Sequence, residues 1–208
     1  MAALRTPRSV LTVMAHPDDA ELWTGGTLAL CSAAGAEVTV AVPSHEDAVR
    51  NLEAAEGAAI LDAKLYQYSE PTVASLRELL LAVRPEVVIT HQLRDVHPDH
   101  RHVAHTLTAA LPDVVIATGH PQRVYAADTY NSLTEDGPVP AHTTVDITAT
   151  FERKQRALAA HTSQPIAEHF GPMAETLARL WGSRIGARYG ENFVPLTILG
   201  RLSAATAL

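Results

Sequence analysis

The sequence predicts an α/β protein with a Rossmann-like, mostly parallel sheet and helices on both faces of it. Short runs of β-branched and apolar residues alternate along the chain with longer segments of helical periodicity. Parallel strands need crossover connections, which such helices supply. The chain has 208 residues, of which 47% are hydrophobic, so it can bury a full core without disulfide bonds. We therefore expect a single domain over residues 1–208.

The first elements predict a βαβ unit. A strand is expected over residues 10–15, then a helix that begins at Asp18 or Asp19 and is stopped by Gly35, then a strand over residues 37–42. The Gly25-Gly26 pair lies well inside this helix, and a full G-x-G-x-x-G motif is absent. Close helix packing therefore explains the two glycines better than a nucleotide-binding loop does.

The later elements continue the alternation of helices and strands. Arg84-Pro85 breaks a helical pattern, and a new strand is expected shortly after Pro112. Helices are predicted over residues 46–61, 71–83, 98–111, 151–161 and 166–181, strands over 64–68, 87–90, 114–117, 123–127 and 143–147, and an irregular segment after residue 181.

Composition excludes several classes of function. Sixteen Lys+Arg against 23 Asp+Glu give a net charge of -7, and no basic stripe is present to neutralise phosphates, which argues against a nucleic-acid partner. No apolar run approaches the roughly 20 residues needed to span a bilayer, and the N-terminus lacks a signal-peptide pattern. Cys31 is the single cysteine, so no disulfide framework exists. We expect a cytoplasmic protein with no membrane partner.

Two clusters of histidine and aspartate follow predicted strands. His16-Pro17-Asp18-Asp19 comes directly after the strand at residues 10–15, and His97-Pro98-Asp99-His100 follows the strand at residues 87–90. Ligands of open α/β sheets bind beyond the carboxyl ends of the strands. The two clusters are therefore predicted to be halves of one site.

The residue types in these clusters indicate metal chemistry. Catalytic zinc keeps three protein ligands and leaves a position for water, and His16, Asp19 and His100 would fill that set. Asp18 then remains free to act as a base. Either cluster alone could also be a helix cap, since short polar residues and carboxylates are favoured there. Capping requires neither the histidines nor their repetition, so the combination favours a metal site.

The two clusters resemble the motifs of the PIG-L (LmbE-like) N-deacetylase family. The family's first motif, AHPDD with a following acidic residue and a Gly-Gly pair, is similar to residues 15–21 with Gly25-Gly26, and its second, HPDH, to residues 97–100. Further similar segments are residues 50–53, 84–89, 145–148 and 161–164. The resemblance therefore covers nearly the whole chain.

The resemblance implies a zinc-dependent N-deacetylase with assigned residues. His16, Asp19 and His100 would hold a divalent metal, usually Zn²⁺ although Fe²⁺ would also suit these ligands. Asp18 would be the general base, and His97 the electrophilic histidine beside the substrate carbonyl, preferably protonated.

Other residues are given supporting roles by the same resemblance. Asp99 or Asp95 would orient and charge His97. Arg50 matches the family position that contacts a polar group of the substrate, and Asn131 lies where the pocket wall is expected. The chain departs from the family in the loop after the second strand, which borders the substrate and is shortened here to residues 43–47.

The implied function is a metal-dependent hydrolase that removes an N-acetyl group from a small metabolite, such as an N-acetyl amino sugar or glycoside. An intermediate of a natural-product pathway is the alternative substrate. More remote alternatives are a non-haem Fe(II) oxygenase, because two histidines and a carboxylate also form its ligand set, and a non-catalytic binding module. Family members commonly assemble as trimers or hexamers, so a homo-oligomer is expected.

Overall fold

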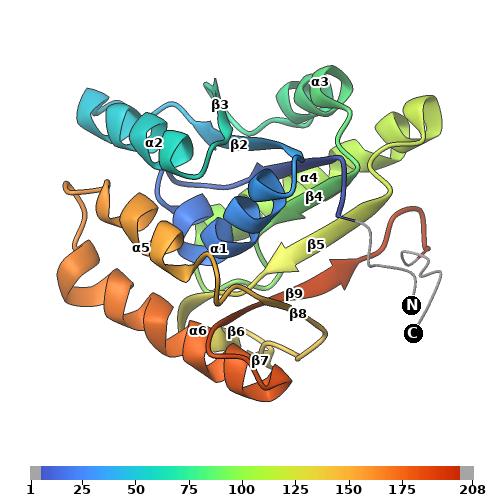
Figure 1. Cartoon of the computed structure of the whole chain (residues 1–208). Helices are drawn as coiled ribbons and strands as arrows, with labels where there is room; N and C mark the ends of the chain where they lie inside the picture. The colour runs from blue at the N-terminus through green and yellow to red at the C-terminus, as the bar shows by residue number, and fades with distance from the viewer. Residues whose placement is uncertain (1–5, 202–208) are drawn as a thin grey trace.

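The computed structural model describes residues 6–201, and a seven-stranded sheet forms its centre (Figure 1). The spatial order is β3-β2-β1-β4-β5-β9-β8. Neighbours among β1 to β5 run parallel, whereas β9 is antiparallel to both β5 and β8. The predicted mostly parallel α/β sheet is thus confirmed. The strands are β1 Ser9–Val13, β2 Glu37–Pro43, β3 Lys64–Tyr68, β4 Val87–Thr90, β5 Arg123–Ala127, β8 Thr143–Asp146 and β9 Gly190–Leu196.

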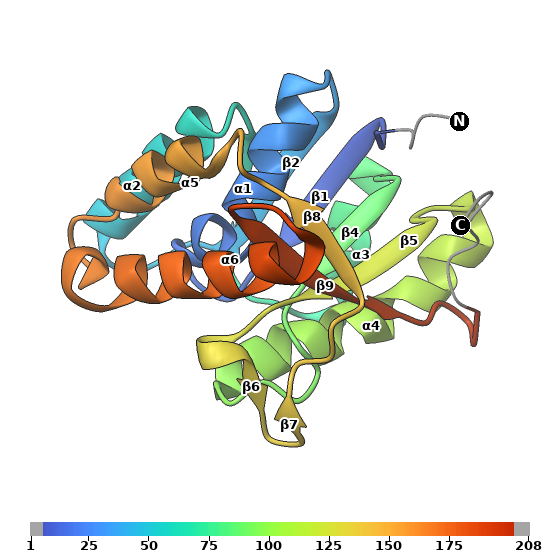
Figure 2. The same ribbon diagram turned by 60° about the horizontal axis from the view of Figure 1, so that its bottom comes forward.

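Helices cover both faces of the sheet, as Figures 1 and 2 show. Helices α1, α2, α5 and α6 lie on one face, and α3 and α4 pack together on the other. The helices are α1 Asp19–Ala33, α2 Ala48–Ile60, α3 Val73–Val83, α4 Pro98–Thr118, α5 Phe151–Ala159 and α6 Gly171–Ile185. Shorter elements are a 3₁₀ turn at Tyr130–Ser132, a hairpin of β6 Leu133–Thr134 with β7 Gly137–Pro138, and a π-helical turn at Ile166–Phe170.

Alternating side chains of the central strands build one core on each face. Val10 and Val38 pack in the core beneath α1, α5 and α6, while Leu11, Val13 and Ala41 pack beneath α3 and α4. Because both faces are covered, the central strands are continuous apolar runs rather than alternating ones.

The predicted strand at residues 114–117 is wrong, because these residues form the last turns of α4. Val103, Leu107 and Val114 are buried against α3 and continue one helical stripe past Pro112. Pro112 sits inside the helix, where its fixed φ is compatible and only one backbone hydrogen bond is lost. The β-branched run at residues 114–116 favours a strand locally, but the apolar stripe of the helix continues across Pro112.

The predicted irregular C-terminal segment is also wrong in part, because residues 190–196 form β9. This strand inserts between β5 and β8, pairing Val124 with Leu196 and Thr143 with Phe193. Pro195 lies within this strand, and proline is unfavourable in the interior of a sheet. The antiparallel pairing with β5 and β8 is long-range, so nothing in the neighbouring sequence indicates it. The predicted helix over residues 166–181 is instead a π-helical turn followed by α6.

The close-packing interpretation of the glycine pair is confirmed. A Cβ on Gly26 would lie 2.6 Å from Ile147 Cδ1, and one on Gly25 would lie 3.2 Å from Lys154 Cγ. The pair lets α1 lie directly against the start of α5. Among residues 6–201, no helix is long and apolar enough to cross a membrane.

Candidate active site

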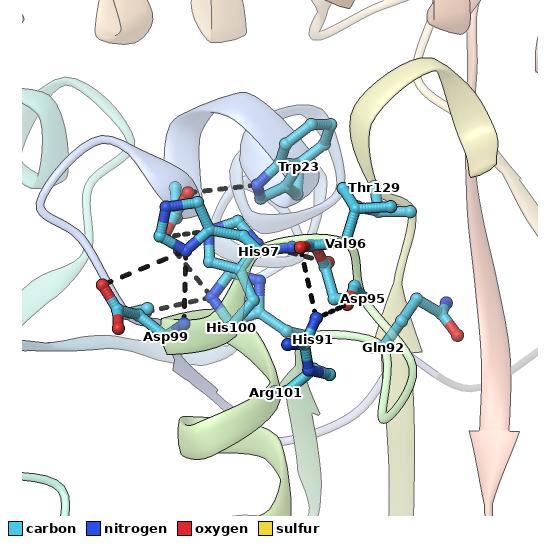
Figure 3. A network of polar contacts seen from close by, with 12 residues as sticks. Trp23, His91, Gln92, Asp95, Val96, His97, Asp99, His100, Arg101 and Thr129 are labelled. Carbon is cyan, nitrogen blue, oxygen red and sulfur yellow. Dashed lines mark hydrogen bonds and ion pairs between the residues drawn. The ribbon is translucent and has the colours of Figure 1, made fainter. Parts of the chain in front are cut away.

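Both polar clusters lie at the carboxyl ends of β1 and β4, two neighbouring strands at the centre of the sheet. The chain leaves β1 through α1 toward β2, and leaves β4 through α4 toward β5, so the strand order reverses between β1 and β4. Such a reversal opens a crevice in which α/β proteins bind ligands. The expectation that the two clusters form one site agrees with this placement, and Figure 3 shows His97, Asp99 and His100 of the second cluster near Trp23 of α1.

Three of the predicted ligands bring one donor atom each to a common point. His16 Nδ1 lies 3.1 Å from Asp19 Oδ2 and 3.3 Å from His100 Nε2, and Asp19 Oδ2 lies 3.4 Å from His100 Nε2. With zinc–ligand distances near 2.0–2.1 Å, two ligand atoms of a tetrahedral site are about 3.3 Å apart. The triangle therefore has the size that a tetrahedral zinc requires.

Partners on the far side of each ligand prepare its donor atom. Asp95 Oδ2 lies 3.2 Å from His100 Nδ1, and both side chains are fully buried. Asp99 Oδ2 lies 3.4 Å from His16 Nε2. A carboxylate beside one ring nitrogen holds the proton there and leaves the other nitrogen free to bind a metal. Trp23 Nε1 likewise donates to Asp19 Oδ1 and leaves Oδ2 in the triangle.

The electrostatics of the triangle favour a positive charge at its centre. Burial alone would lower the pKa of His100, but Asp19 and Asp95 raise it to about 10. Burial opposes ionisation of Asp19, yet His100 and His91 hold its pKa well below the usual range. Because a proton and a metal ion compete for His100 Nε2, the same field that retains the proton attracts a cation. The donor set thus fits a divalent metal.

Two further histidines approach the triangle, but one ring nitrogen of each already accepts a hydrogen bond from a backbone N–H. His91 Nε2, 3.4 Å from Asp19 Oδ2, accepts a hydrogen bond from the Ala15 N–H at 3.0 Å. His97 Nδ1 accepts from the Asp99 N–H at 3.3 Å, which caps α4. A neutral imidazole has only one lone pair for such a bond, so the other nitrogen carries hydrogen and cannot ligate. His91 instead stacks on His100, with ring centroids 3.8 Å apart.

The geometry of His97 differs from the expectation in two respects. Asp95 accepts a hydrogen bond from the His97 backbone N–H, but its carboxylate contacts the ring of His100. The Asp99 carboxylate lies 3.4 Å from His16 Nε2 and 3.9 Å from His97 Nδ1. Burial, then His100 and His16, lower the pKa of His97 and outweigh Asp99, which raises it, so the ring is neutral and presents Nε2–H.

Asp18 lies beside the triangle with its carboxylate mostly buried. As the residue before α1 it makes no side-chain cap bond, and its Oδ1 instead accepts from Arg50 Nη2 at 3.2 Å. Burial and then the neighbouring charge of Asp19 raise the pKa of Asp18, while His161 and Arg50 act in the opposite direction. A carboxylate whose pKa is raised is suited to accept a proton near neutral pH.

The two predicted substrate-binding residues fall in different places. Arg50 reaches the site from α2 through Asp18. Asn131 is exposed, in a left-handed conformation with φ of 52°, and the structure does not bring it into the triangle. Its neighbour Tyr130 does reach the site, because its ring stacks on His100 at 5.7 Å and meets Trp23 edge-on at 5.1 Å.

A buried pair behind Asp18 was missed as part of the site by sequence reasoning. Glu21 Oε2 lies 3.5 Å from His161 Nε2, and both side chains are almost fully buried. Burial would lower the pKa of His161, but Glu21 and then Asp18 raise it. The sequence could have predicted the contact of Trp23 with Asp19, since the two residues lie one helical turn apart. It could not predict the pairing of Glu21 with His161, because these residues are far apart in the sequence.

Comparison with known proteins gives related sequences and folds. The PIG-L family model, described as GlcNAc-PI de-N-acetylase, matches residues 11–111, which include both clusters. Diacetylchitobiose deacetylase of Thermococcus kodakarensis is 27% identical over 90% of this chain and 84% of its own length. A 1D-myo-inositol 2-acetamido-2-deoxy-α-D-glucopyranoside deacetylase of Actinosynnema mirum is 28% identical over 77% of this chain and 82% of its own length.

Structural comparison shows that this fold alone does not determine the reaction. The crystal structure of GalB, a 4-carboxy-2-hydroxymuconate hydratase of Pseudomonas putida, superposes with a TM-score of 0.80 at 21% identity, covering 96% of this chain and all of that one. The structure of N,N'-diacetylchitobiose deacetylase of Pyrococcus horikoshii superposes with a TM-score of 0.74 at 25% identity, covering 91% of this chain and 84% of that one. A hydratase and a deacetylase thus share the architecture, so the reaction must be argued from the residues of the site.

Proposed function

Because the PIG-L family model matches residues 11–111, we propose that the chain is a member of this family and a metal-dependent N-deacetylase acting on a small acetamido sugar or glycoside. The observation that carries the proposal is the triangle of His16 Nδ1, Asp19 Oδ2 and His100 Nε2, with the buried carboxylate of Asp18 beside it. A purely structural metal site would close its fourth position with another protein ligand. Here a base and a hydrogen-bond donor adjoin the three ligands instead.

His16, Asp19 and His100 would hold the metal, for which we propose Zn²⁺. Fe²⁺ is the alternative, since two histidines and a carboxylate suit both ions. When bound, such a metal supplies Lewis acidity and lowers the pKa of water to about 7.

The proton transfers follow from the positions of Asp18 and His97. Asp18 accepts the proton of the attacking water, and the new C–O bond leaves negative charge on the former amide oxygen. His97, a neutral ring with its proton on Nε2, donates a hydrogen bond to that oxygen. Asp18 then returns the proton to the departing nitrogen as the C–N bond breaks, which yields acetate and a free amine. In this scheme Asp99 supports His16 rather than His97.

The names of both relatives support an acetamido sugar as substrate, since each deacetylates such a sugar. An N-acylated natural-product intermediate is the alternative substrate. The short loop over residues 43–47 borders this part of the site and is the main departure from the family pattern.

The test is release of free amine by the zinc-loaded protein from a panel of N-acetyl amino sugars and N-acylated natural products. Asp18→Asn keeps the shape of the side chain but removes the base, and should lower kcat by about 10²- to 10⁴-fold with zinc still bound. Full turnover in Asp18→Asn would rule out the base role. Oxygen uptake with a keto-acid cosubstrate, in the absence of amine release, would instead identify an oxygenase.

We further propose a homo-oligomer, a trimer or hexamer, in the cytoplasm. Light scattering on the purified protein measures its mass in solution, and a monomer would contradict the first part. Cell fractionation tests the second.

A further inference from the structure

The short loop between β2 and α2 places a second side chain beside Arg50. This loop leaves the carboxyl end of β2, the strand next to β1, and so borders the proposed active site (Figure 1). Arg50 Nη2 donates to Asp18, while Nη1 lies 3.3 Å from Nε2 of the exposed His45. His45 is therefore one guanidinium away from the proposed base.

Hydrogen bonds hold the backbone and the ring of His45 in place. Asn51 Oδ1 accepts from the His45 N–H at 2.8 Å, and Asn51 Nδ2 donates to the His45 carbonyl at 2.7 Å. Gln67 in turn donates to Asn51. The Asp47 N–H donates to His45 Nδ1 at 3.0 Å and so fixes the direction of the ring. The position of His45 is thus set before any ligand binds.

The bond from Asp47 determines the tautomer of the ring. Since Nδ1 of His45 accepts a hydrogen bond, Nδ1 carries no hydrogen itself, and Nε2 carries the N–H of the ring. The N–H of His45 Nε2 and the N–H of Arg50 Nη1 therefore face each other, two donors without an acceptor between them. Two N–H donors therefore meet where the loop joins α2.

We propose that His45 and Arg50 form a subsite for an oxyanion, a carboxylate or a phosphate, carried by the substrate near its acetamido group. A group that only accepts hydrogen bonds satisfies both facing donors, whereas a hydroxyl must also place its own proton. This proposal rests on the proposed function and narrows its substrate class to acidic acetamido sugars. Arg50 thereby binds the base with one nitrogen and the substrate with another, which aligns the acetamide with Asp18.

The test compares N-acetylglucosamine with N-acetylglucosamine 6-phosphate and N-acetylmuramic acid on the zinc-loaded protein. The measured quantity is the ratio of kcat/KM for each acidic sugar to that for the neutral one. We expect the ratio to exceed one for at least one acidic sugar, to fall about tenfold in His45→Ala, and to recover in part in His45→Gln, whose amide can donate. Glu46→Ala, an exposed neighbour in the same loop, is the matched control and should leave the ratio unchanged.

A ratio that is equal in wild type and His45→Ala would overturn the subsite. An equal loss of kcat/KM for acidic and neutral sugars would also overturn it, because His45 would then only hold Arg50 in position. A second measurement does not depend on turnover. In protein labelled with ¹⁵N-histidine, inorganic phosphate should shift the His45 Nε2 resonance saturably. If no acetamido sugar is hydrolysed but the shift occurs, the proposed function fails and the subsite stands. Hydrolysis without any shift overturns the subsite alone.

Discussion

Replacing Asp95 by asparagine should weaken metal binding without touching a ligand atom. Asp95 is fully buried, with Oδ2 3.2 Å from His100 Nδ1 and Oδ1 accepting from the His97 N–H. Asparagine can keep the second contact through its carbonyl oxygen. Its NH₂ group would then face His100 Nδ1, which favours the tautomer with hydrogen on Nε2, the nitrogen that must bind the metal.

Loss of such an outer partner lowers metal affinity by roughly 10- to 100-fold, which is about 1.4–2.8 kcal/mol. The affinity for Zn²⁺ is measured by competition with a chromophoric chelator, and thermal unfolding of the metal-free protein shows whether the variant folds. Asp99→Asn is the matched control. Its side chain is 66% exposed and 3.4 Å from His16 Nε2, so its loss should cost at most about fivefold.

Unchanged zinc affinity in a folded Asp95→Asn protein would contradict this prediction, because it would show that the tautomer of His100 does not depend on Asp95. An equal loss in Asp95→Asn and Asp99→Asn would refute it as well, since burial would then not matter.

Three further predictions concern stability. Gly57→Ala should destabilise the protein by about 1–3 kcal/mol in urea unfolding, because the added Cβ would lie 2.5 Å from Glu21 Oε1. Glu191→Gln should cost about 3–5 kcal/mol in the same assay, since it leaves the buried charge of Lys154, 2.6 Å away, without an opposite charge. In the metal-free protein the pKa of His100 is raised from 6.5 to about 10, so folding is stabilised by its proton below pH 6.5, and this stabilisation should be lost as pH rises through 10. Urea unfolding across that pH range measures the loss.

Controls for these predictions come from the same elements. Glu56→Ala, on the exposed side of α2, should change stability by less than about 0.5 kcal/mol, and an equal effect at Gly57 would contradict the packing argument. Glu37→Gln removes an exposed partner of Lys64 and should be silent compared with Glu191→Gln. His100→Gln should flatten the pH dependence, and a slope that persists would assign it to another group.

Local patterns predicted most of the fold because the central strands and helices have clear periodicity. Where they failed, the deciding contact was distant. Residues 114–117 are helical because Val114 packs on α3, and residues 190–196 are a strand because they pair with β5 and β8. Neither contact can be inferred from the residues next to these segments. Pro112 and Pro195 indicate breaks in secondary structure locally, but the packing of the helix and the pairing of the strand outweigh them.

Residue types and their order indicate which groups can do chemistry, since each of the two His/Asp clusters follows a predicted strand. Because ligands of open α/β sheets bind beyond the carboxyl ends of the strands, the meeting of His16, Asp19 and His100 was predictable. The partners of these groups depend on packing between elements. This packing pairs Asp95 with His100 rather than His97, brings Tyr130 onto the site instead of Asn131, and sets His45 against Arg50. Tautomers and pKa values depend on distances of a few ångströms between side chains of separate elements. Tertiary packing sets those distances, so the local sequence does not determine them.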